Sequence, residues 1–205
     1  MKTYPILFRG DMVLAILAGS KTMTRRPVKV PLGTQSDWDL SPVADPVPML
    51  YCLSGDHIVL NTRCGRPAKA MQDHILRCPF GAPGDRLWVR ETLRAVPWQD
   101  TPARDVGYDA DGSNAVSPNG KFYPWCWPGK SKRPSIHMPR WACRLLLDVL
   151  SVRVERVESI TEADARAEGF PDRAAFLASF GKTYPDLSKN GWVWVVEFKR
   201  VEAGT

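Results

Sequence analysis

The sequence lacks any long run of apolar residues. No stretch approaches the roughly 20 consecutive apolar residues that a membrane-spanning helix needs. Near the N-terminus, the apolar segment Tyr4–Phe8 is interrupted by Arg9, and it is too short for the hydrophobic part of a signal peptide. The sequence therefore predicts a cytoplasmic protein with no membrane partner.

Cysteine is sparse and irregularly placed. The chain holds five cysteines, an odd number, and none of them forms a C-x-x-C pair. In a reducing compartment such cysteines are expected to be free thiols. Cysteines and histidines crowd one segment, but their spacing matches no zinc motif; they are Cys52, His57, Cys64, His74 and Cys78. We therefore predict no metal site, and no motif indicates a cofactor.

Extremes of composition are also absent. Apolar residues make up 44% of the 205 residues and charged residues 24%, with a net charge of +6, which excludes intrinsic disorder, collagen-like repeats and a coiled coil. The length suits one domain with additions and is too short for two enzyme-sized domains. Eighteen prolines and fifteen glycines predict much turn and loop.

Alternating apolar residues predict that strands dominate the fold. The clearest strand patterns lie at 86–92, 144–160 and 192–198, and the last is too continuous to be an exposed edge. Short helices are expected after Asp11, after Thr161 and over 174–180, each with a suitable start or stop signal. We predict an α+β fold dominated by strands, a small β-barrel with a few short flanking helices.

Two Pro- and Gly-rich segments interrupt this pattern. They lie at about 30–77 and 95–130 and are expected to be irregular insertions in a single domain. Within the first, Ser54-Gly55-Asp56 separates two apolar pieces and predicts a hairpin turn. The basic residues lie mainly in the N-terminal segment and in 121–160, whereas aspartates gather in 96–120.

The densest polar cluster follows the first predicted helix, over residues 19–26. Its composition alone favours a basic strand on a solvated face, without a functional role. Residues three apart on a straight strand face opposite sides, so Lys21 and Thr24 converge only if the chain bends near Gly19. On a flat strand, Thr22 and Arg26 would share a face with Thr24.

The order of elements resembles the ASCH domain, a relative of the PUA-type RNA-binding barrel. Its motif is matched by Gly19, Lys21, Thr24 and Arg26, and further matches are 84–87, 160–168 and 195–198. The resemblance covers the barrel elements, about 5–27, 79–92 and 135–201. It is strongest to the larger ASCH proteins of phages and prophages, so a phage-encoded chain would act in the host cytoplasm.

A small bacterial branch of the family has threonine at the position of Thr24 and also resembles this chain at Lys21 and Glu168. Its members are amidohydrolases that deacetylate N4-acetylcytidine. The resemblance implies Thr24 as nucleophile, Lys21 as its activator and Glu168 as acid/base partner. The chemistry requires Lys21 to be held neutral by burial or by nearby positive charge, which Arg25 and Arg26 could supply. The alternative is that the same cluster only contacts a ligand.

A second set of residues points to a nucleoside or nucleic acid ligand. Rings and cations interleave after residue 120, which suits stacking on unpaired bases and phosphate contacts. The expected substrate- or RNA-binding residues are Arg26, Arg90, Glu91, Trp125, Trp127, His137 and Arg140.

Each of these residues also has a structural alternative. Arg90 and Glu91 could form an Arg–Glu pair, Trp125 and Trp127 could pack over the barrel mouth, and His137 could make a plain loop contact. Two other functions are possible for the whole protein. One is a non-catalytic module that binds RNA or a modified base. The other is a nuclease, which is supported only by the breadth of the family.

Overall fold

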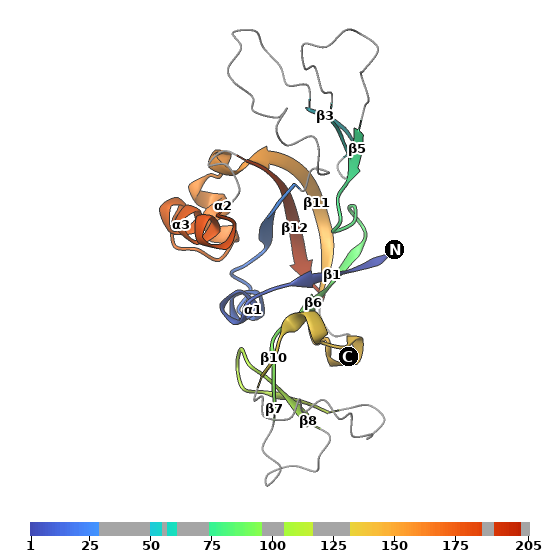
Figure 1. Cartoon of the computed structure of the whole chain (residues 1–205), viewed down its shortest axis with the longest axis vertical. Helices are drawn as coiled ribbons and strands as arrows, with labels where there is room; N and C mark the ends of the chain where they lie inside the picture. The colour runs from blue at the N-terminus through green and yellow to red at the C-terminus, as the bar shows by residue number, and fades with distance from the viewer. Residues whose placement is uncertain are drawn as a thin grey trace.

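The computed structural model describes residues 1–28, 50–54, 57–60, 74–95, 105–116, 132–185 and 191–201. A five-stranded sheet forms its centre, in the order β1-β6-β11-β12-β2 (Figure 1). Its strands are β1 (Thr3–Leu7), β6 (Arg86–Arg90), β11 (Leu146–Arg156), β12 (Trp192–Arg200) and β2 (Met23–Pro27). β1 and β6 are parallel, and the other neighbours are antiparallel.

Two smaller sheets lie beyond the ends of this sheet, at opposite ends of the molecule (Figure 1). One comprises β3 (Leu50–Ser54), β4 (His57–Leu60) and β5 (His74–Arg77). The other has the order β10-β7-β8-β9, with bounds β7 (Leu93–Ala95), β8 (Asp105–Tyr108), β9 (Asn114–Val116) and β10 (Lys132–Arg133). The predicted insertions are therefore not wholly irregular. Strands this short have too few residues to show a clear alternation, so whether they form depends on pairing with a neighbouring strand.

The helices pack on both sides of the central sheet. They are α1 (Gly10–Leu17), α2 (Glu162–Ala167) and α3 (Arg173–Thr183), with short 3-10 turns η3 (Ser135–His137), η4 (Arg140–Ala142) and η5 (Val157–Ser159). The capping box predicted at α2 is present, because Thr161 accepts from the Asp164 N–H and Asp164 accepts from the Thr161 N–H. No helix among the described residues is long and apolar enough to cross a membrane.

β12 separates two hydrophobic clusters, which explains its continuous apolar run. Trp194, Val196 and Phe198 pack in the cluster that contains α1 residues. Val193 and Val195 face the other way, against residues of α2 and α3. Because both faces of the strand are covered, alternation is lost and β12 lies inside the sheet, as predicted.

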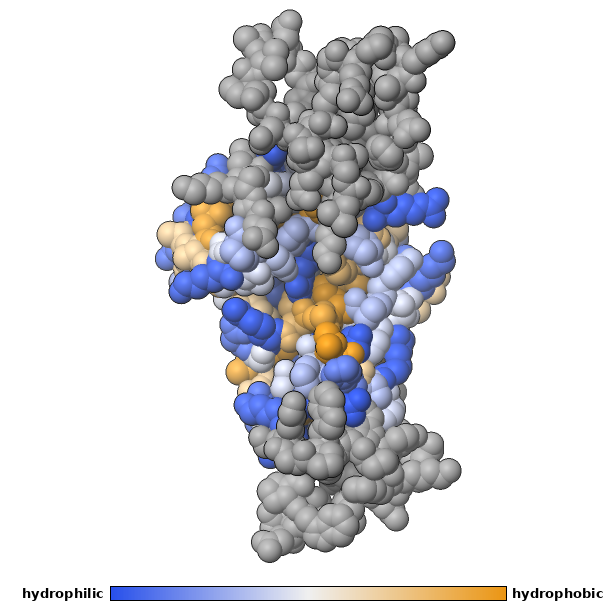
Figure 2. Space-filling model, in the orientation of Figure 1, coloured by the Kyte–Doolittle hydropathy of each residue, from blue (hydrophilic) through white to orange (hydrophobic). Residues whose placement is uncertain are grey.

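The sheet curves so that its two edge strands approach each other. β1 and β2 do not pair in the part of the chain that the structure describes, so the sheet is open there. Arg26 of β2 bridges them by donating from Nη2 to the backbone oxygen of Leu7, at 2.5 Å. The α+β, strand-rich class is confirmed. On the face shown in Figure 2, apolar side chains gather at mid-height with hydrophilic ones around them.

Candidate active site at the open edge of the sheet

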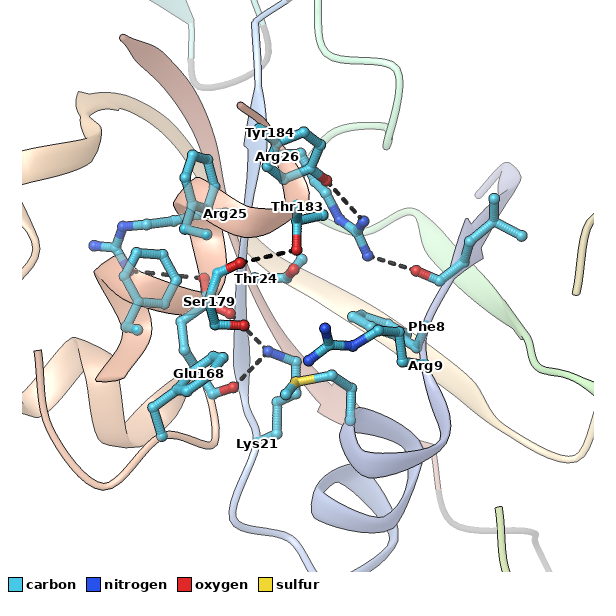
Figure 3. A pocket seen from close by; sticks show the side chains of 15 residues that line it. Phe8, Arg9, Lys21, Thr24, Arg25, Arg26, Glu168, Ser179, Thr183 and Tyr184 are labelled. Carbon is cyan, nitrogen blue, oxygen red and sulfur yellow. Dashed lines mark hydrogen bonds and ion pairs between the residues drawn. The ribbon is translucent and has the colours of Figure 1, made fainter. Parts of the chain in front are cut away.

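A pocket of about 100 Å³ lies where β2, α1 and the α2–α3 region meet (Figure 3). Residues from four parts of the chain line it: Leu7, Phe8, Arg9, Met12, Lys21, Thr24, Arg25, Arg26, Glu168, Phe170, Phe176, Ser179, Phe180, Thr183 and Tyr184. Its wall thus combines aromatic rings with several cations and one carboxylate. The three residues predicted to be catalytic, Lys21, Thr24 and Glu168, are all among them.

The chain bends before β2, and this bend brings Lys21 and Thr24 to one pocket. Gly19 has a φ of +76°, a conformation that favours glycine. Lys21 precedes the strand, which begins only at Met23. The exposed Thr22 is held by its backbone, which donates to the oxygen of Ala167 at 2.8 Å. Strand alternation therefore does not separate Lys21 from Thr24.

Glycine is also required where α2 ends, beside Lys21. Gly169 has a φ of +86°, and a Cβ there would lie 3.2 Å from the Ala15 side chain and 3.5 Å from Cβ of Lys21. The close approach lets the preceding residue, Glu168, reach the lysine.

Lys21 and Glu168 form a buried pair. The Lys21 ammonium donates to Glu168 Oε2 at 2.6 Å and to the Glu168 backbone oxygen at 2.7 Å, and each residue is 3% exposed. Burial lowers the pKa of Lys21, although the Glu168 carboxylate opposes this. Burial likewise raises the pKa of Glu168, against the opposing effects of Lys21 and Arg25. The two pKa values are thus drawn towards each other, which favours proton transfer within the pair.

Thr24 and Arg26 present their side chains to the same pocket. Thr24 is 3% exposed, and its hydroxyl makes no hydrogen bond within the described part of the chain. The Arg26 guanidinium donates to the Tyr184 hydroxyl at 3.3 Å and lies over the Phe8 ring, 5.2 Å from its centroid. Its Nε is buried without a hydrogen-bond partner. The site therefore holds an unengaged hydroxyl and an unengaged cationic N–H.

Helix α3 and the residue after it form one wall of the pocket, which the sequence did not predict. Ser179, Thr183 and Tyr184 line the pocket together with the rings of Phe176 and Phe180. The signal lay in the helical spacing of hydroxyl and aromatic side chains over 176–184. It identifies one face of the helix, but not what that face meets.

Glu91 lies outside the pocket, in a structural pair. It is 1% exposed, and both of its oxygens accept from Arg144, at 2.8 and 2.7 Å. Its partner is therefore Arg144 and not its neighbour Arg90, the last residue of β6. The expected substrate-binding role of Glu91 has no support in this position.

Arg90 and Arg140 lie together, away from the pocket lining. Both guanidinium groups lie over the Trp88 ring, 5.1 and 5.3 Å from its centroid, and Arg90 also donates to the backbone oxygen of Ile136. The neighbouring His137 is exposed. Trp125 and Trp127 lie outside the described residues, so their predicted role stays a prediction.

No family model, curated protein or solved structure matches the chain. These comparisons therefore assign no function to the chain. Within the described ranges, no group of three or more His, Cys, Asp and Glu side chains is arranged to hold a metal ion.

Proposed function

We propose that this protein is an amidohydrolase that removes the acyl group from an N4-acylated cytosine, in a nucleoside, a nucleotide or RNA. The proposal takes the open sheet to be an ASCH-type, PUA-like barrel. The observation that carries it is the meeting of Thr24 with the buried Lys21–Glu168 pair, 2.6 Å from Nζ to Oε2, in one pocket.

Lys21 activates the nucleophile in this proposal. A threonine hydroxyl attacks an amide only when a base takes its proton. Lys21 can be that base in its neutral form, and burial, with a smaller effect of Arg26, lowers its pKa towards this form. Glu168, whose pKa burial raises, can hold the proton that Lys21 gives up.

The reaction then proceeds in two balanced stages. The Thr24 oxygen bonds to the acyl carbon, the C–N4 bond breaks, and the proton that came from Thr24 passes through Lys21–Glu168 to the departing N4 amine. Water next adds to the acyl-threonine ester with Lys21 as base, so that the carboxylic acid leaves and the Thr24 hydroxyl is restored. The unpaired Nε–H of Arg26 is a donor for the carbonyl oxygen as it gains charge.

The rest of the pocket suits a planar, partly polar ligand. Phe8, Phe170 and Phe180 provide apolar surface, whereas Ser179 and Thr183 provide hydroxyl groups. A cytosine ring offers flat faces together with ring acceptors, and such ligands are commonly held by a few polar groups in a mainly apolar pocket.

The test is incubation with N4-acetylcytidine and a panel of other N4-acyl cytosines, with chromatography to detect the deacylated base. Lys21→Ala and Thr24→Ala should abolish product. The matched control is Thr22→Ala, which removes a threonine from the same segment but outside the pocket lining. If wild-type protein turns over none of the panel, the amidohydrolase proposal fails.

The second candidate is a non-catalytic module that binds RNA or a modified base. Two observations favour it: Lys21 already donates two hydrogen bonds to Glu168, and Trp88 lies against two arginines. It predicts RNA binding that weakens steeply with salt, because phosphate contacts release counterions. Binding that survives Lys21→Ala, with no turnover by wild type, would support this candidate.

A further inference from the structure

Arg25 lies in the wall of the pocket, fully buried, and it connects β2 to two other elements. Its side chain is 0% exposed. Because arginine is rarely buried without partners, its charge is expected to be held by nearby groups. Nη2 donates to Glu155 Oε2 at 3.0 Å and to Asp164 Oδ2 at 2.9 Å. Asp164 also closes the capping box of α2, so Arg25 ties β2 to both β11 and α2.

The other end of the guanidinium approaches Glu168. Oε2 of that carboxylate accepts from Lys21, whereas Oε1 is buried with no hydrogen bond. Arg25 Nη1 lies 3.9 Å from Oε1, too far for a hydrogen bond and close enough for a strong charge interaction. A buried carboxylate oxygen left in this state is costly, and its position in the pocket makes it available to a ligand.

We propose that Arg25 is a positioning residue, which turns the Glu168 carboxylate so that Oε2 takes Lys21 and Oε1 is left for the substrate. The inference rests on the proposed function, in which Glu168 carries the proton for the leaving amine. Arg25 acts through Glu168 in this proposal, because its two terminal nitrogens are held by Glu155, Asp164 and the Met23 sulfur, while its Nε is buried without a hydrogen bond.

Charges of alternating sign surround the carboxylate. Three cations face Glu168 or its partner lysine, or are that lysine: Lys21 before β2, and Arg25 and Arg26 in β2. Three carboxylates lie near these groups: Asp164 in α2, Glu155 in β11 and Asp11 in α1. Arg25 lies between Glu168 and the two other carboxylates. Without it, three negative groups would face one another, and Glu168 would take up a proton most readily, since it is the most buried.

The experiment follows the titration of Lys21 and Glu168 by NMR in the free protein, and kcat and KM in parallel. Arg25→Gln removes the charge and keeps an amide that can bond Asp164. It should raise the pKa of Glu168, because a neighbouring positive charge is lost, and reduce kcat about 10-fold with little change in KM, because the acid is misoriented. Arg25→Lys, which restores the charge, should recover the wild-type titration.

Arg153→Gln is the matched control. Arg153 also bonds Glu155, at 2.5 Å from Nε to Oε1, but it makes no contact with Glu168 among the described residues. It should leave both titrations and kcat unchanged. A folded Arg25→Gln protein with the wild-type titration of Glu168, or an equal shift in Arg153→Gln, overturns the inference.

The proposal can still be tested if Arg25→Gln does not fold or if the wild-type protein is inactive. If Arg25→Gln does not fold, Arg25→Lys carries the test: it loses the forked contact, so kcat should fall at constant KM, and a wild-type kcat would overturn the proposal. If wild-type protein hydrolyses no acylcytosine, the proposed function fails, whereas the titrations still decide whether Arg25 controls Glu168.

Discussion

Two buried glutamates, Glu168 and Glu91, differ in how completely their carboxylate oxygens are hydrogen-bonded. They are 3% and 1% exposed, and each meets a cation. Arg144 satisfies both oxygens of Glu91 with a fork of two hydrogen bonds. Lys21 satisfies one oxygen of Glu168 and leaves the other without a partner.

The protonation behaviour of the two sites differs accordingly. Burial acts to lower the pKa of Arg144, but hydrogen bonds from Glu91 and Asp111 outweigh it and raise that pKa. The Arg144 guanidinium therefore stays charged and joins Glu91, which follows β6, to the segment 109–113 and to the residues just before β11. At Glu168, burial outweighs the partner and raises the pKa of the carboxyl, while burial lowers the pKa of Lys21, so that a proton can pass between the two groups. The comparison teaches that complete satisfaction stabilises, whereas incomplete satisfaction is typical of a reactive site.

The largest expected effect is on activity. Under the proposed amidohydrolase function, Glu168→Gln should lower kcat for acylcytosine hydrolysis by about 1000-fold, because the group proposed to carry the leaving-group proton is lost. Glu91→Gln should leave kcat within about twofold, since Glu91 does not line the pocket. Steady-state kinetics of the two folded variants measure this, and equal losses would contradict the division of roles.

The order reverses for stability. Glu91→Gln should lower the free energy of unfolding by about 3 kcal/mol, because Arg144 loses a buried, two-pronged partner. Urea unfolding monitored by circular dichroism provides the measurement. The idea fails if Glu168→Gln proves the more destabilised of the two proteins.

Removal of both partners of the buried Lys21–Glu168 pair should stabilise the protein. Lys21→Met with Glu168→Leu is expected to raise the unfolding free energy by about 1 kcal/mol, because both charges are desolvated and one oxygen is unpaired. The double variant should be inactive. A loss of stability, measured by the same urea unfolding, would indicate that the pair serves mainly to hold the fold.

The pH dependence follows from the lowered pKa of Lys21. Only the neutral amine can take the Thr24 proton, so kcat/KM should rise with pH until the pH passes that pKa, which lies below 10.5. Glu168→Gln removes a charge that raises the pKa of Lys21, so this limb should move to lower pH. A pH profile of the residual activity tests it, and a limb that stays in place would exclude Lys21 as the base.

The smallest effect concerns acid stability at the other site. The Arg144 hydrogen bond lowers the pKa of Asp111 from 3.8 to about 2, so its contribution is present above pH 3.8 and is lost as the pH falls towards 2. Because Asp111 is partly exposed, the loss should stay below about 1 kcal/mol. Thermal unfolding of wild type and Asp111→Asn between these pH values measures it, and the Asn variant should lack this part of the decline.

Local features of this protein could be predicted from the sequence, whereas contacts between distant residues could not. The bend at Gly19, the capping box at Thr161 and the inner position of β12 were predictable, because glycine, a capping side chain and an unbroken apolar run act over a few residues. The link from Lys21 to Glu168 came only from the family resemblance. The partner of Glu91 was not found, because Arg90 was nearer in sequence than Arg144.

By itself, the sequence determined the strand-rich α+β class, the local turns and the set of chemically able side chains. Tertiary structure alone decided which of them act together: Lys21 and Glu168 are 147 residues apart, and Glu91 and Arg144 are 53 apart. Burial changes the protonation of a group only after distant segments have excluded water from it. Whether a charged pair fastens the fold or moves a proton therefore depends on how completely those segments satisfy it.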